Sequence, residues 1–265
     1  METEFVKINQ LTYHIQQHII NPNRPTIIFL HDSLGSVKLW RDFPEKLAQA
    51  TNCNALIYDR EGHGESSAFN ITKRPINYLE LGADTLNQII QQLNLNQIIL
   101  FGHSDGATIA LQYAAKYHTN LIATIVEGVH VFVEEETLNG IKEAKQALKT
   151  TNLKERVAKY HGDKTELLFK LWMETWLSDE YRNWNIEKEI KNIQSPILVF
   201  QGENDEFGTI EQVDKIKTNV NCKVEDYLIK DCGHNPHKEQ PEFTLNTTTN
   251  FIKQSILSYD ETISK

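Results

Sequence analysis

The sequence predicts an α/β fold in which a mostly parallel sheet is flanked by helices and carries a helical cap insertion. Three observations support this prediction. Apolar runs of strand length alternate with helical patterns along the first half of the chain. These runs lack polar interruptions, which is typical of strands covered on both faces. From 134 to 190 the alternation stops, and this segment is charged and helical with no strand-like run.

The elements follow one another in a repeating strand–helix order. Apolar runs predict strands at 5–8, 11–15, 26–30, 55–58, 98–101, 122–126, 197–200 and 224–229. Apolar residues at spacings of three and four predict helices at 37–50, 76–93, 106–117 and 239–256. A loop rich in Gly and Ser occupies 60–75. We therefore expect one α/β core of residues 1–133 and 191–265, interrupted by a cap at 134–190.

The composition limits the classes of partner. The chain has 265 residues, of which 40% are hydrophobic and 24% charged, so it can bury a sizeable core. Its formal net charge is −9. This charge argues against a nucleic-acid partner or an anionic membrane partner, because such surfaces need clustered Lys and Arg. We expect a small-molecule partner and a monomer or a homodimer.

Targeting signals and cysteines indicate the compartment. The N-terminus METEFVKINQ lacks the basic start and the apolar run of a secretory signal. The apolar runs are far shorter than the ~20 residues that a membrane helix needs. Cys53, Cys222 and Cys232 are widely spaced and form no CxxC pair, which favours reduced thiols over a disulfide or a zinc site. We expect a cytoplasmic protein without a bound metal.

A G-x-S-x-G motif stands where a predicted strand meets a predicted helix. The segment at 102–106 reads GHSDG and directly follows the strand at 98–101. A serine on so sharp a turn has its hydroxyl exposed above the sheet, and the two glycines allow the backbones to approach closely. The N-terminus of the following helix favours a negative charge that forms beside this serine. Ser104 is therefore the candidate nucleophile.

A serine nucleophile needs a histidine base and an acid to orient it. The predicted strand at 197–200 is followed by GENDE at 202–206, and the strand at 224–229 by DCGH at 231–234. The carboxyl ends of parallel strands meet at one edge of a sheet, so Asp205 and His234 can converge on Ser104. Their chain order, Ser then Asp then His, is that of the α/β-hydrolases.

Nearby residues compete for these roles. His237 is a second candidate base, but the Gly-His step directly after a strand favours His234. Glu203 and Glu206 flank Asp205 and remain alternative acids. We interpret the other loop histidines, His63 and His103, as hydrogen-bonding supports, and Cys232 as a small apolar residue packed beneath the histidine loop.

With these motifs, nearly the whole chain resembles the α/β-hydrolase superfamily and its helical-capped esterase branch. The segments HDSLGS at 31–36, DREGHGES at 59–66 and GHNPHKEQP at 233–241 are similar to further loops of that family. Among its subgroups, the Ser-Asp-Gly elbow and the Trp-bearing cap look most like biphenyl-hydrolase-like serine esterases. The resemblance implies that Ser104 is the nucleophile, His234 the general base and acid, and Asp205 the orienting carboxylate.

The resemblance also implies an oxyanion hole. Its donors would be the backbone N–H groups of Asp105 and Ser33. The family usually has Gly where this chain has Asp32, so the second donor is Ser33 or its neighbour. Removing one such donor typically slows the reaction by about 10²–10³.

Aromatic residues of the cap are candidates for the substrate cavity. Phe169, Trp172 and Trp176 recur at spacings of three and four, which fits either a buried core or a cavity wall. We expect them, together with His130 and Phe132, to bind substrate. Asp105 and the acidic run at 134–136 suggest a preference for substrates with a positive charge; alternatively, the Asp105 side chain faces solvent or a loop.

These residues predict a serine hydrolase that acts on small or medium carboxylic esters, a carboxylesterase without a metal or organic cofactor. Serine at the elbow counts against dehalogenases and epoxide hydrolases of the same fold, which resemble this chain elsewhere but have Asp there. C–C bond hydrolases, perhydrolases and acyltransferases share the triad and stay open. A ligand receptor that retains the hydrolase fold is the alternative from another class.

Overall fold

The computed structural model describes residues 1–263 and is built around an eight-stranded sheet. The sheet order is β1-β2-β4-β3-β5-β6-β7-β8, and only the first two pairings are antiparallel. The strands are β1 (Glu2–Ile8), β2 (Leu11–His18), β3 (Thr26–Leu30), β4 (Asn54–Tyr58), β5 (Ile98–His103), β6 (Leu121–Glu127), β7 (Ile197–Gly202) and β8 (Val224–Ile229). The predicted mostly parallel sheet is confirmed.

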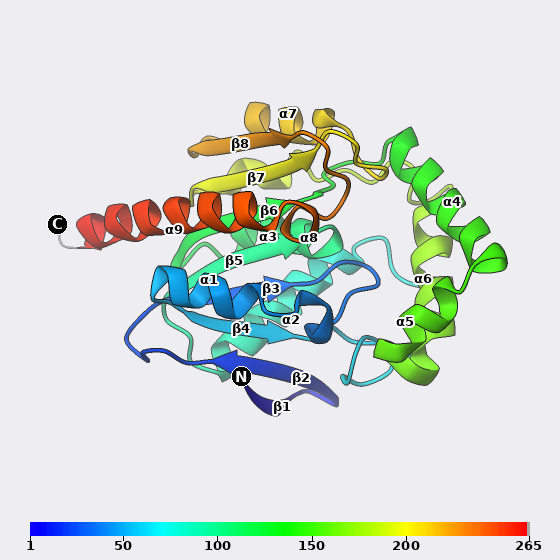
Figure 1. Cartoon of the computed structure of the whole chain (residues 1–265), viewed down its shortest axis with the longest axis horizontal. Helices are drawn as coiled ribbons and strands as arrows, with labels where there is room; N and C mark the ends of the chain where they lie inside the picture. Colours follow the sequence, from blue (N-terminus) through cyan, green and yellow to red (C-terminus); the bar gives the residue numbers. More distant parts are fainter. Residues whose placement is uncertain (264–265) are drawn as a thin grey trace.

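Helices cover both faces of this sheet (Figure 1). On one face α1 (Phe43–Thr51) packs beside α9 (Pro241–Ile263), and their apolar residues share a cluster with Phe29 and Phe101 of the strands. On the other face lie α2 (Tyr78–Gln92), α3 (Asp105–Lys116) and α7 (Ile210–Asn219). Burial on both sides explains why the central strands read as continuous apolar runs.

Three helices between β6 and β7 form a separate layer beyond the carboxyl ends of the strands (Figure 1). They are α4 (Glu135–Thr150), α5 (Leu153–His161) and α6 (Thr165–Trp176), and all lie within 134–190. Helix α6 buries most of its residues, because its aromatic side chains join the apolar cluster that also contains α2 and α3. The edge of the sheet that bears the candidate residues therefore lies under this layer.

Two predicted helices have different bounds in the structure. The helix expected at 37–50 is a 3₁₀ helix, Val37–Trp40, followed by α1. Arg41 separates them at φ 54°, and Pro44 can only sit in the first turn of a helix because it has no N–H. The helix expected at 239–256 begins at Pro241, after a short α8 (Pro236–Glu239), and continues to Ile263. No helix within residues 1–263 is long and apolar enough to span a membrane.

Candidate active site

Ser104 occupies a strained turn between β5 and α3. Its backbone has φ 54° and ψ −120°, a conformation that non-glycine residues rarely adopt and that clusters at functional sites. The turn is tight because a side chain at Gly106 would place its Cβ 2.0 Å from the carbonyl oxygen of Leu30. The Gly-x-Ser-x-Gly spacing thus produces the turn that the sequence predicts, with Ser104 at the start of a helix.

His234 and Asp205 meet as the sequence predicts. The Nδ1 atom of His234 lies 2.8 Å and 2.9 Å from the two carboxylate oxygens of Asp205. The same carboxylate accepts hydrogen bonds from the Phe207 N–H and the Gln201 side chain. Because Nδ1–H donates to Asp205, the lone pair of His234 is on Nε2. Neither Glu203 nor Glu206 takes the place of Asp205.

The ion pair perturbs both pKa values. Burial alone would lower the pKa of His234, but the charge and hydrogen bond of Asp205 outweigh burial, and the pKa of His234 lies above its ordinary value. Burial would raise the pKa of Asp205, but the charge of His234 and its hydrogen bond hold that pKa at about 2. Asp205 is therefore ionised at neutral pH, which favours Nδ1 protonation of His234.

A cavity of about 120 Å³ joins Ser104 to His234. We call it the Ser104 cavity. It is lined by Asp32, Ser33, Leu34, Ser104, Asp105, His130, Thr137, Ile141, Trp172, Trp176, Phe207, His234 and Asn235. Its residues come from six segments far apart in the sequence, which the carboxyl ends of the strands and the helical layer bring together.

The structure brings some of the expected substrate-binding residues to this cavity and not others. His130, Trp172 and Trp176 line it. Phe169 lies on the same helix as Trp172 and Trp176, but it packs in the apolar cluster between this helix and the core. Phe132 is half-buried and forms a β-bridge with Asn185. His130 is buried, and burial lowers its pKa to about 4, so it enters the cavity as a neutral side chain.

The loop after β3 contributes Ser33 and Asp32 to the cavity. The carbonyl oxygen of Ser33 lies 3.1 Å from Nε2 of His63, which holds this peptide from the next loop. The Asp32 carboxylate lies 3.6 Å from Nδ1 of His103. Burial would raise the pKa of Asp32, but the charges of His103 and Lys238 lower it to about 2. His63 and His103 thus make supporting contacts, as the sequence suggests.

The side chain of Asp105 is not a free charge in the cavity. Its carboxylate accepts a hydrogen bond from the Tyr78 hydroxyl at 3.1 Å and lies 3.6 Å from Nη1 of Arg60. Tyr78 in turn accepts a hydrogen bond from the Trp176 indole at 3.0 Å. The backbone N–H of Asp105 belongs to the first turn of α3, where such groups have no partner within the helix. Asp105 therefore offers a backbone donor while Arg60 balances its carboxylate.

The acidic run at the start of α4 is also engaged. Glu134 accepts hydrogen bonds from the Thr209 N–H and hydroxyl and from the Gln212 amide. These contacts fix the start of α7. Glu135 forms an exposed ion pair with Arg182. The predicted attraction for cationic substrates thus loses two of its supporting charges, because Asp105 lies beside Arg60 and Glu135 pairs with Arg182.

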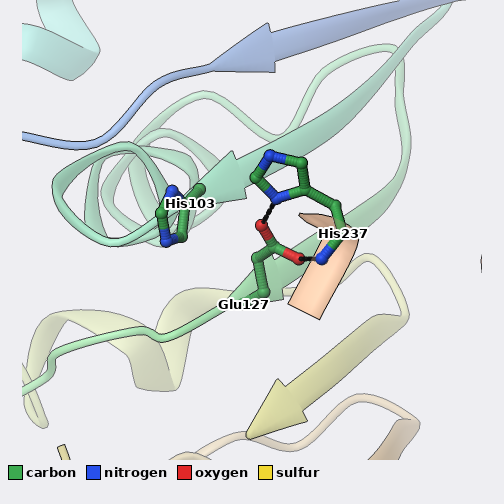
Figure 2. Close-up of side chains that lie close together, drawn as sticks. All are labelled: His103, Glu127 and His237. Carbon is green, nitrogen blue, oxygen red and sulfur yellow. Dashed lines mark hydrogen bonds and ion pairs between the residues drawn. The ribbon is translucent and has the colours of Figure 1, made fainter. Parts of the chain in front are cut away.

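A second acid–histidine pair lies behind the histidine loop. Figure 2 shows Glu127, at the end of β6, bound to both the backbone N–H and Nδ1 of His237. His103 lies beside this pair and contacts the carbonyl oxygen of His234 through Nε2 at 2.9 Å. All three side chains are buried, and none of them lines the Ser104 cavity. His237 is therefore placed as a support for the loop, whereas His234 lines the Ser104 cavity.

Within residues 1–263, these three residues are also a group whose side chains could bind a metal. The candidate ligand atoms of His103, Glu127 and His237 lie within 4.8 Å of one another. However, both carboxylate oxygens of Glu127 accept hydrogen bonds from His237, and His103 binds a backbone carbonyl. The hydrogen bonds assign the cluster a structural role in holding the loop that carries His234.

The residues that attach the helical layer to this edge were not predicted from the sequence. Nδ1 of His161 accepts a hydrogen bond from the Gly64 N–H at 3.0 Å, and its Nε2 lies 2.9 Å from the Leu34 carbonyl oxygen. Lys164 donates to carbonyl oxygens of His63, Gly64 and Ser66. The contacts of Arg60, Tyr78 and Glu127 were also not predicted. Glu127 had a visible signal, since it is the acid that ends an otherwise apolar strand.

Residues 27–247 match the sequence model of the alpha/beta hydrolase family. The chain belongs to this family. The match and the sheet order together confirm the predicted α/β-hydrolase fold, with Ser104 at the elbow position of this hydrolase.

Known proteins of similar sequence and structure agree with this assignment. A candidate esterase/lipase of Haemophilus influenzae is 26% identical over 276 aligned residues, which cover 92% of this chain and 89% of that protein. A 2-succinyl-6-hydroxy-2,4-cyclohexadiene-1-carboxylate synthase of an Enterobacter species is 23% identical over 255 residues, 83% of this chain and 88% of the enzyme. The crystal structure of a bacterial membrane phospholipase A superposes with a TM-score of 0.78 at 15% identity, covering 96% of this chain and 86% of the other. The similarity to the phospholipase shows a shared fold alone.

Proposed function

We propose that this alpha/beta hydrolase is a serine carboxylesterase that cleaves small or medium esters through an acyl-enzyme on Ser104. One observation carries the proposal. A serine in a strained elbow and a histidine whose Nδ1 is bound by a carboxylate line the same cavity. That combination is the arrangement that makes a serine hydroxyl nucleophilic at neutral pH.

The chemistry follows from the tautomer of His234. With Nδ1–H donating to Asp205, Nε2 accepts the proton of the Ser104 hydroxyl as Oγ attacks the ester carbonyl carbon. The imidazolium that forms is stabilised by the Asp205 carboxylate. It then donates the proton to the departing alcohol. Water attacks the acyl-enzyme in the second half-reaction, with His234 again as base, and releases the acid and Ser104.

The negative charge of the tetrahedral intermediate needs backbone donors. The Asp105 N–H stands at the N-terminus of α3, where the partial positive charge of the helix adds to its effect. Ser33, in the loop after β3, is the proposed second donor. His63 and His161 fix the neighbouring carbonyl groups of this loop, which supports a preorganised donor rather than a mobile one.

The cavity favours a compact acyl or alcohol group. Its volume of about 120 Å³ is close to that of a benzene-sized site, since an apolar cavity of about 150 Å³ holds benzene. Trp172, Trp176 and Ile141 form apolar walls. Esters with long chains would need the helical layer to move, so we propose a preference for short and medium chains.

Labelling with a fluorophosphonate probe tests the proposal directly. We expect the wild-type protein to be labelled, and Ser104→Ala to show no labelling. Ser36→Ala is the matched control, because Ser36 is also buried in a loop at this edge but lies outside the Ser104 cavity. p-Nitrophenyl esters of increasing chain length then measure the chain preference through kcat/KM.

The same experiment separates the alternatives. A wild-type protein that the probe does not label would contradict the serine mechanism and leave a ligand receptor on a hydrolase fold. Labelling of Ser104 without turnover of any ester would instead direct the search to C–C substrates, peracids or acyl acceptors, which use the same triad.

A further inference from the structure

A second cavity, of about 140 Å³, lies beside the Ser104 cavity and shares none of its lining residues. We call it the Arg74 cavity. Its walls come from β2, the end of β4, the 60–75 loop and α2, and include the aromatic side chains of Tyr13, Tyr58, Phe69 and Tyr78. Arg60, Glu61 and Arg74 are its charged residues. The cavity is thus an aromatic space with two guanidinium groups in its wall.

Arg74 is a buried cation whose guanidinium contacts aromatic rings and no carboxylate in the described part of the chain. It is 5% exposed, and none of the ion pairs within residues 1–263 includes it. Its Nη1 atom is buried without a hydrogen-bond partner. The guanidinium lies 4.7 Å from the ring centre of Tyr78 and 5.5 Å from that of Phe69. Cation–π contacts offset only part of the cost of removing such a charge from water.

The neighbouring carboxylates do not contact the Arg74 guanidinium. Arg60 faces Asp105 at 3.6 Å and donates to the Asp32 carbonyl, so its charge is balanced. Glu61 is the one acid in the wall of the cavity. Its Oε1 has no hydrogen-bond partner, and Glu61 forms no ion pair with Arg74. The wall therefore holds no carboxylate in direct contact with Arg74.

We propose that the Arg74 cavity binds a small carboxylate with an apolar body, such as an aromatic ring or a short alkyl chain. A carboxylate matches the planar, forked donors of a guanidinium, which can bind both of its oxygens. The aromatic walls would hold the apolar body. The volume suits one ring, because an apolar cavity of about 150 Å³ accommodates benzene.

The position of the cavity gives this ligand a link to the candidate active site. Arg60 and Tyr78 form part of its wall and both contact the carboxylate of Asp105. The backbone N–H of Asp105 is the proposed oxyanion donor. The binding site itself does not depend on ester hydrolysis, so it is tested in a protein that lacks the candidate nucleophile.

Calorimetric titration of Ser104→Ala with benzoate and with benzamide, its neutral analogue, tests the proposal. We expect benzoate to bind more tightly than benzamide by about ten-fold or more, as for a charge-assisted hydrogen bond. Adding Arg74→Gln should remove this difference. The control Lys73→Gln should not, because Lys73 is the adjacent residue, is exposed, and pairs with Glu180.

A second variant gives an effect of opposite sign. Glu61→Gln keeps the size of the side chain and removes the acid, so it should tighten benzoate binding and leave benzamide binding unchanged. Glu61→Gln therefore tests carboxylate binding in the Arg74 cavity even if Arg74→Gln does not fold. Equal binding of benzoate and benzamide, or no gain with Glu61→Gln, overturns the proposal. Loss of benzoate binding in Trp172→Phe also overturns it, since Trp172 lines the Ser104 cavity.

Discussion

His161 of α5 accepts a hydrogen bond from the backbone N–H of Gly64 at 3.0 Å. The contact fixes the tautomer of the imidazole. Because Nδ1 accepts, the proton is on Nε2, which donates to the Leu34 carbonyl at 2.9 Å. One side chain of the helical layer therefore ties together two loops at the edge of the sheet, and Leu34 is adjacent to the proposed oxyanion donor Ser33.

Replacing His161 should weaken both loops at once. We expect His161→Ala to lower the free energy of unfolding by about 1–3 kcal/mol, the usual cost of leaving buried partners unpaired. It should also lower kcat/KM for a p-nitrophenyl ester, mainly through kcat, because the oxyanion loop loses an anchor. His118→Ala, at an exposed histidine, is the control for both measurements. An unchanged kcat would show that the His161 contact does not position the oxyanion loop.

Gly128 packs against the candidate base. It has φ 54°, and a Cβ at this position would lie 2.7 Å from Cε1 of His234. Gly128→Ala should displace the imidazole and reduce kcat/KM well beyond its effect on stability. Gly162→Ala is a matched control, because Gly162 has φ 56° and no atom within 4 Å of the added Cβ. Both variants carry the backbone strain of about 1–2 kcal/mol, so only the contact with His234 differs.

The two histidines of the 234–237 loop should respond differently to substitution. His234→Ala should lower kcat by about 10⁴-fold or more, as is typical when the base of a serine triad is lost. His237→Ala should instead reduce the free energy of unfolding by about 3–5 kcal/mol, because it removes the imidazole that pairs with the buried Glu127 carboxylate. Labelling of Ser104 in the folded fraction of His237→Ala should persist. If His237→Ala kept the wild-type free energy of unfolding but was not labelled, His237 would be the base.

The pH dependence of kcat/KM should report the His234–Asp205 pair. The pKa of His234 is raised from 6.5, and only the neutral imidazole can accept the Ser104 proton. Activity should therefore be low under acidic conditions and rise through a midpoint above 6.5. Asp205→Asn should move this midpoint to lower pH and reduce kcat by about 10⁴. A flat profile between pH 5 and 8 would contradict the role of His234.

Asp105→Asn tests whether this side chain selects cationic substrates. Since Arg60 already balances the carboxylate, we expect the ratio of kcat/KM for amino esters and neutral esters of equal size to change little. The variant should be less stable, because the Arg60 guanidinium loses its buried partner. A ratio that falls markedly would restore the idea that Asp105 recognises a positive charge.

The strand segments and the elbow could be predicted because both depend on local sequence. Runs such as 98–101 are apolar at every position, and a strand buried on both faces requires that pattern. The spacing of Gly102, Ser104 and Gly106 encodes the turn, since only Gly leaves room for the approach to Leu30. Helix bounds were less accurate where proline and left-handed residues interrupt an otherwise regular apolar pattern, as at 41–44.

The pairing of side chains across the sheet edge was decided only by the tertiary structure. Whether Asp105 faces solvent, substrate or Arg60 depends on where the loop after β4 lies, and no short-range pattern contains that information. The same is true of Phe169, whose helical spacing equals that of Trp172 while its surroundings differ. The sequence alone determined the fold class and the residues Ser104, Asp205 and His234 as candidates, because strand ends and tight turns are local. The structure alone determined which charges are paired and that Arg74 forms no ion pair within residues 1–263, because ion pairing depends on distances between segments far apart in the chain.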